Sequence, residues 1–203
     1  MLEIDKKTRK IKTKNHYKSK PNKKQIVIAF SLRKNDYFYK RLTHKEYGES
    51  KKWNTYTISR EGVIYEHYNP IYYTDFLNKK DWDKQSISII LENMGALLKK
   101  NNKHINWVNE VCDDENVVDY KWMGDRYWEN IYSKQFYSTI ELVNFLCDKF
   151  NIPKNIIEFH SYHDDSAKFK GVLFRSNYIE DSTDINPNFN IDKFNNWMKI
   201  INQ

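Results

Sequence analysis

The sequence has few cysteines, glycines and prolines. Its 203 residues include two cysteines, five glycines and four prolines. Cys112 and Cys147 do not form a Cys-x-x-Cys motif, and two cysteines are too few for a disulfide framework. With 39% hydrophobic and 16% aromatic residues, the composition indicates a globular chain with a substantial core, made in a reducing compartment.

Long apolar segments are also absent. No run approaches the length of a membrane span, and the charged N-terminus lacks the apolar core of a signal peptide. We therefore expect no membrane partner, and a protein made in the cytoplasm.

The body of the chain carries almost no net charge. Residues 1–24 contain ten Lys or Arg and two acidic residues, whereas the remainder has 24 basic and 25 acidic residues. This asymmetry predicts a basic, flexible N-terminal arm at 1–24 and a folded domain at 25–203. The high isoelectric point is then no sign of a nucleic-acid-binding face, and any contact with nucleic acid would be made by the arm.

Hydrophobic patterns predict strands, one hairpin and helices along the domain. Two apolar, β-branched runs read as buried strands, and Gly62 ends the connection of a hairpin. The predicted elements are a strand at 25–31, a hairpin at 53–68, a strand at 86–93, and helices at 133–151 and 192–201. They indicate an α/β single domain with a mixed central β-sheet flanked by helices.

The predicted helix at 133–151 has the clearest boundaries. Ser133 suits the N-cap and Pro153 follows the end of the helix. Cys147 falls on its apolar face, which predicts an inert core residue instead of a nucleophile.

Residues 94–132 form an aromatic-rich stretch that we expect to be an insertion. Its aromatic side chains could stack on sugar rings, but packing against the domain is the commoner role of such residues. They include Trp107, Trp122, Tyr127 and Trp128.

Two short motifs near the C-terminus carry a resemblance to a known family. Residues 156–161 have the form hydrophobic-x-x-His-Ser, and residues 183–189 read Thr-Asp-x-x-Pro-x-Phe. They resemble the zinc-dependent N-acetylmuramoyl-L-alanine amidases, a fold shared with phage amidase lysozymes and peptidoglycan recognition proteins. The resemblance implies that His160 and Asp184 are metal ligands, and it extends over roughly residues 25–200.

Two positions depart from the family at the residues that carry the chemistry. The first strand of the family reads Ile-Val-Ile-His-His-Thr, and its first His, a zinc ligand, corresponds to Ala29. In the strand at 86–93 the family's catalytic Glu corresponds to Ile90. Glu92 lies on the same face as Ile90, displaced by roughly 6–7 Å, and is a candidate for the catalytic carboxylate.

Other matches suggest where substrate would bind. The hairpin resembles the family's own, with Asn54 and Thr55 at positions that often hold His or Tyr. Residues 170–178 resemble a phage-encoded branch of amidase-like proteins. Asn54, Thr55 and Arg175 are therefore candidates for substrate binding.

A zinc hydrolase needs three protein ligands and one open position. His163 is the nearest candidate for the third ligand, with Asp164 and Asp165 as its hydrogen-bond acceptors, while His44 and His67 would serve only if the fold brings them in. With two ligands, zinc binding would be possible but weakened.

Three functional interpretations follow. The first is a phage-encoded amidase-like protein that acts at or recognises bacterial peptidoglycan, with zinc hydrolysis lost or reduced. The second is an active zinc amidase with a rebuilt site. The third is a structural or adaptor protein of a virion with a vestigial cleft, which would contact other virion proteins. In each case the protein is made in the bacterial cytoplasm, and it is packaged in the virion or released at lysis.

Overall fold

The computed structural model describes residues 2–34, 38–44, 50–158, 160–180 and 186–200. A central five-stranded sheet has the order β10-β1-β4-β2-β3. Strands β10, β1, β4 and β2 are parallel, and β3 is antiparallel to β2, so the sheet is mixed, as predicted. Its strands are β1 (Gln25–Phe30), β2 (Tyr56–Ile58), β3 (Ile64–Glu66), β4 (Ser86–Leu91) and β10 (Gly171–Phe174).

The two inner strands are where the sequence predicted them. Every residue of β1 is buried, and all of β4 except Ile90, which is partly exposed, because layers of chain cover both faces of the sheet. Because successive side chains of a strand point to opposite faces, this sheet has one apolar face and one face that carries polar side chains. The polar face carries Gln25, Thr55, Thr57, Ser86 and Ser88.

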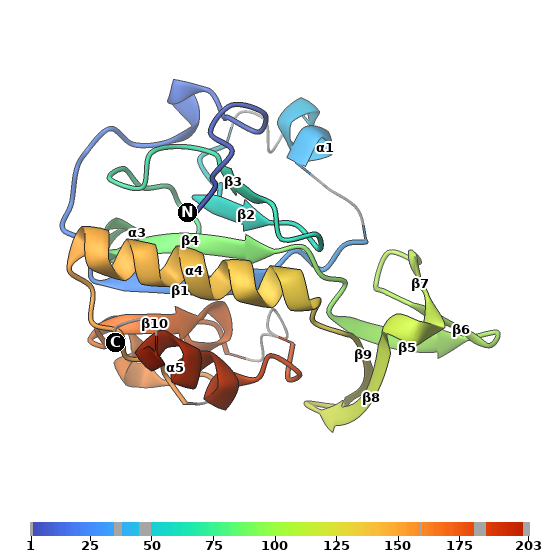
Figure 1. Ribbon diagram of the computed structural model, residues 1–203. Helices are drawn as coiled ribbons and strands as arrows, with labels where there is room; N and C mark the ends of the chain where they lie inside the picture. Colours follow the sequence, from blue (N-terminus) through green and yellow to red (C-terminus); the bar gives the residue numbers. More distant parts are fainter. Residues whose placement is uncertain (1, 35–37, 45–49, 159, 181–185, 201–203) are drawn as a thin grey trace.

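Helix α4 (Ser133–Phe150) crosses the sheet, and α5 (Ile191–Ile200) lies beside it (Figure 1). Ser133 is not the N-cap of α4; the cap is Tyr132, which makes no side-chain capping bond. The short helices are α1 (Phe38–Thr43) and α3 (Lys80–Gln85), with 3-10 turns at Thr13–Asn15, Asp114–Asn116, Asp164–Ala167 and Arg175–Asn177. Among the described residues no helix has both the length and the apolar character needed to cross a bilayer.

The turn of the β2–β3 hairpin packs against α4. Gly62 has a φ of 85°, a conformation that glycine adopts without strain. A Cβ at this position would lie 2.8 Å from Ser138 Oγ and 2.9 Å from the Lys134 carbonyl oxygen. Glycine therefore allows the hairpin to lie close to the helix.

The segment between β4 and α4 folds as a second five-stranded sheet, with the order β7-β6-β5-β9-β8. It projects from the body of the molecule (Figure 1). Its small core contains Met94, Leu97 and Cys112. The strands are β5 (Ala96–Lys100), β6 (Lys103–Ile105), β7 (Val111–Cys112), β8 (Val117–Trp122) and β9 (Asp125–Glu129).

The N-terminal segment lies against the domain, which differs from the flexible arm that its charge suggested. Asp5 pairs with β3 through two backbone hydrogen bonds, and the Ile11 amide donates to the His67 carbonyl at 3.0 Å. Arg9 and Lys23 are only 7% and 3% exposed. Buried partners thus hold this basic segment in place.

Candidate functional site

The positions that the sequence resemblance aligns with the family's zinc ligand and catalytic Glu lie side by side. Ala29 of β1 is the register partner of Ile90 of β4, which in turn pairs with Thr57 of β2. Register partners in a parallel sheet project their side chains from the same face. Neither the Ala29 nor the Ile90 side chain has an atom that can bind a metal ion or accept a proton.

His160 is surrounded by aromatic side chains. Its ring centroid lies 4.8 Å from that of Phe174 and 6.3 Å from that of Trp122. We call these three residues the His160 cluster. The chain before His160 makes an isolated bridge between Ile156 and Val172.

Burial in this cluster lowers the pKa of His160 to about 4, although a hydrogen bond with the Phe189 backbone opposes the shift. The Nδ1 atom of His160 is buried and has no hydrogen-bond partner among the described residues. The imidazole is therefore neutral at physiological pH.

The remaining candidate ligands do not complete a site. His163 is exposed, and its Nδ1 accepts a hydrogen bond from the Asp165 amide at 3.1 Å, which caps its own 3-10 turn. Asp184 lies outside the described residues. In the part of the chain that the structure describes, no three His, Cys, Asp or Glu side chains are grouped to hold a metal ion. The described residues thus do not fit zinc.

His67 and Asn54 belong to a buried hydrogen-bond chain. His67 Nδ1 donates to the Arg9 carbonyl at 2.7 Å, because a carbonyl can only accept, so Nε2 accepts from the Thr57 hydroxyl at 2.7 Å. Asn54 Nδ2 donates to Thr57 Oγ1 at 2.8 Å. Burial lowers the pKa of His67 to about 3. Both side chains hold the domain together and are closed to a ligand.

Thr55 is also buried and hydrogen-bonded, whereas Arg175 lies in another part of the domain, beside Phe76. The Thr55 hydroxyl donates to Tyr68 Oη at 2.9 Å and lies 3.3 Å from Ser88 Oγ. Thr55 is only 1% exposed. The Arg175 guanidinium lies 5.1 Å from the centroid of the Phe76 ring. Asn54 and Thr55 are thus inaccessible, and the structure does not bring Arg175 into the cavity described next.

Glu92 lines a cavity of about 340 Å³ beside the end of β4. Its carboxylate makes a buried ion pair with Arg9 at 2.8 Å. Arg9 also stacks on Tyr65, with its Cζ 3.6 Å from the ring centroid. The N-terminal segment thus forms one wall of this space, which we call the charged cavity.

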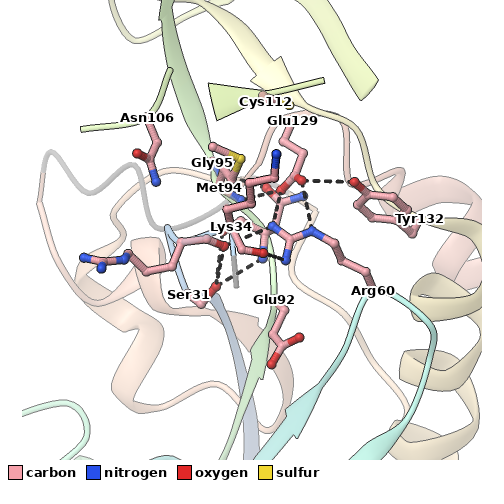
Figure 2. Close-up of polar contacts among 12 residues, drawn as sticks. Ser31, Lys34, Arg60, Glu92, Met94, Gly95, Asn106, Cys112, Glu129 and Tyr132 are labelled. Carbon is pink, nitrogen blue, oxygen red and sulfur yellow. Dashed lines mark hydrogen bonds and ion pairs between the residues drawn. The ribbon is translucent and has the colours of Figure 1, made fainter. Parts of the chain in front are cut away.

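The opposite wall of the charged cavity is built on Arg60 and Glu129. Arg60 from the β2–β3 turn donates Nε and Nη2 to the two Glu129 oxygens, each at 3.0 Å (Figure 2). Glu129 also accepts from the Tyr132 hydroxyl at 3.1 Å and from the Met94 amide. Burial alone would lower the pKa of Arg60, but the ion pair with Glu129 raises it overall. With four donors, Glu129 is a structural acceptor and has no capacity left for proton transfer.

The charged cavity carries both signs of charge. Its cations are Arg9, Lys34 and Arg60, and its anions are Glu61, Glu92, Asp113 and Glu129. A ligand that bears both ammonium and carboxylate groups matches such a lining. Cys112 also lines the cavity, but burial raises the pKa of its thiol to about 12, which excludes a thiolate nucleophile at neutral pH.

Sequence patterns indicated only one member of the charged cavity, Glu92. Arg60 stands in a turn, where an exposed charge is the usual expectation, and its partner Glu129 lies 69 residues later in the chain. The Arg9 pair spans 83 residues. Ion pairs between residues so far apart in the chain leave no pattern in the local sequence.

Comparisons with known proteins establish the fold. No family model and no curated protein matches the sequence. Among solved structures, the N-acetylmuramoyl-L-alanine amidase LysC of Clostridium intestinale aligns with 98% of this chain and 99% of its own, at 14% identity and a TM-score of 0.58. The endolysin amidase LysCS of the same organism aligns with 98% of this chain and 97% of its own, at 14% identity and a TM-score of 0.61.

A third similar structure is the hydrolase AmiA of Staphylococcus aureus, in complex with its ligand. It covers 97% of this chain and 81% of its own, at 8% identity and a TM-score of 0.55. At such low identities the likeness shows a shared fold. The chain therefore has the fold of the peptidoglycan amidases, as its motifs suggested.

Proposed function

We propose that this protein binds bacterial peptidoglycan or its fragments and that its zinc-dependent amide hydrolysis is lost or much reduced. The fold likeness to amidases over nearly the whole chain supports the first part. The pairing of Ala29 with Ile90, where the family carries a ligand and a carboxylate, supports the second. Without a third ligand and a placed base, bound water would not be activated.

The charged cavity is where we expect the wall peptide to bind. Ligands of α/β proteins bind outside the carboxyl ends of parallel strands, and Glu92 directly follows the end of β4. The stem peptides of peptidoglycan carry amino and carboxylate groups, which complement the mixed charges of the lining.

Cosedimentation with purified sacculi tests the binding. The double variant Lys34→Met/Glu61→Gln changes two lining residues: Glu61 is exposed, and the Lys34 side chain is 37% exposed and pairs with Asp113 at 3.6 Å. We expect it to lose most of the bound fraction. Lys103→Met/Glu115→Gln makes the same chemical changes at exposed positions outside the cavity and should bind like the wild type. Equal binding by both double variants, or no binding by the wild type, would contradict the proposal.

Release of peptide amino groups from sacculi, with and without added zinc, tests the loss of hydrolysis. We expect no zinc-dependent release. Zinc-dependent release that His160→Ala abolishes would instead establish an active amidase with a rebuilt site. The geometry gives little support to that alternative, because Arg9 engages Glu92 and His163 caps its own turn.

The biological setting is part of the same proposal. A solved endolysin from Bacillus subtilis shares the fold, at 12% identity and a TM-score of 0.57, which supports an origin in a phage and release at lysis. An adaptor role in a virion would require exposed residues of the N-terminal segment to contact other virion proteins. Wall binding that survives neutralisation of Lys6, Lys7 and Lys10 but fails in the charged-cavity variant would argue against that role.

A further inference from the structure

A second, smaller cavity lies at the junction of α4 and α5. Its volume is about 170 Å³. It is lined by Asn130, Ile131, Ser133, Phe136, Tyr137, Asn188, Asn190 and Lys193. We call it the amide-lined cavity, because three of its residues are asparagines.

Each of these three asparagines uses one side-chain atom locally and leaves the other for a ligand. Asn130 Oδ1 accepts from the Ile131 amide at 2.8 Å, and Asn190 Oδ1 accepts from the Lys193 amide at 2.7 Å. Asn188 Nδ2 donates to Asn186 at 2.9 Å. Two amide donors and one amide acceptor thus have no partner among the described residues.

An aromatic surface stands beside these amides. Tyr137 is 39% exposed, and its ring centroid lies 5.5 Å from that of Trp197, which is 38% exposed. The Lys193 ammonium lies 5.3 Å from the centroid of the Tyr137 ring. The Tyr137 hydroxyl has no hydrogen-bond partner in the part of the chain that the structure describes.

We propose that the amide-lined cavity binds a sugar ring of the N-acetylhexosamine type. Hydroxyl and acetamido groups both donate and accept, which matches amide side chains better than the fixed charges of the first cavity. The apolar face of a sugar ring fits against an exposed tyrosine or tryptophan, and the acetyl methyl fits the apolar Phe136 and Ile131.

One short segment separates the two cavities. Glu129 and Tyr132 line the charged cavity, whereas Asn130, Ile131 and Ser133 line the amide-lined cavity. A branched glycopeptide could therefore place its peptide on one side of this segment and its glycan on the other. The inference rests on the proposed function only for the source of the sugar, the wall glycan.

Titration with the trimer of β-1,4-linked N-acetylglucosamine, followed by NMR chemical shifts and calorimetry, tests the proposal. We expect saturable binding that Tyr137→Ala weakens by about tenfold or more. Phe145→Ala is the matched control, because Phe145 is 37% exposed on the same helix and lies outside the cavity. Tyr137→Phe should retain much of the affinity, because it keeps the ring.

The absence of saturable binding up to about 10 mM sugar would overturn the inference, because a dissociation constant above that value is too weak for a specific site. Unchanged affinity in Tyr137→Ala would overturn it too. Cosedimentation of the same variants with sacculi separates the two proposals. If the trimer fails to bind while sacculi binding persists, only the sugar site falls. If sacculi binding fails while the trimer binds, the proposed wall binding falls, together with the wall glycan as the source of the sugar, and the sugar site stands.

Discussion

The His160 cluster and the charged cavity differ in almost every chemical respect. In the cluster, aromatic rings surround a neutral histidine, whereas three ion pairs line the cavity. The second sheet contributes to both, with Trp122 of β8 in the cluster and Glu129 at the end of β9 in the cavity wall. In this fold the surroundings of His160 are thus aromatic, and the ion pairs line a different hollow.

The largest effect on stability is expected from breaking the ion pair between Arg60 and Glu129 in the charged cavity. Glu129→Ala would leave Arg60 buried without a carboxylate, and we expect the free energy of unfolding to fall by about 3–5 kcal/mol. Denaturant unfolding measures this. Arg60→Met/Glu129→Met should recover much of the loss, because neither charge remains; no difference between the single and double variants would contradict the account.

A smaller effect is expected for the ion pair that fixes the N-terminal segment. Arg9→Met removes the ion pair with the buried Glu92 and the stacking on Tyr65, so we expect a loss of roughly 2–3 kcal/mol in unfolding free energy. Lys10→Met, at an exposed neighbour, is the control. Equal stability of the two variants would show that the segment is held by something other than this pair.

Burial of His160 in its cluster should make the stability of the protein depend on pH. The folded state holds the pKa of His160 at about 4, below the ordinary value of 6.5, so the unfolded chain binds the proton more readily between these values. Stability should therefore fall as pH drops from about 6.5 towards 4.

His160→Phe removes this titration and suits the aromatic surroundings. The loss in unfolding free energy between pH 7 and pH 5 should be smaller in the variant by roughly 1–2 kcal/mol. His67 remains in both proteins and cancels in the difference. An identical pH dependence would show that His160 is not desolvated.

The smallest effect is expected for an ion pair on the surface of the second sheet. Arg126 and Asp119 are paired at 2.7 Å, but both side chains are more than half exposed. Solvent screens such pairs, so Asp119→Ala should leave the denaturation midpoint unchanged within error. A marked loss would show that the contrast with Glu129 does not come from burial.

Local sequence patterns were enough to predict four strands of the central sheet and its two longer helices, but not the fifth strand, β10. The apolar runs at 25–31 and 86–93 became β1 and β4, and the periodic segment at 133–151 became α4. These elements carry strong patterns because their burial repeats along the chain.

The other parts depend on contacts between distant residues. The position of the N-terminal segment depends on Arg9 meeting Glu92, and charge composition alone suggested a solvated tail. The alanine at the position that the resemblance aligns with a zinc ligand could be read from the motif. The aromatic surroundings of His160 could not, because Trp122 comes from another sheet. Asp184 lies outside the described residues, and its role as a ligand remains a prediction.

The metal content of the purified protein tests the central claim most directly. Elemental analysis of the wild type and of His160→Ala, after dialysis against a low concentration of zinc, should show well under one zinc per chain in both, because the described residues offer no set of three ligands. About one zinc per chain in the wild type, lost in His160→Ala, would contradict the claim and show that the chain completes a metal site.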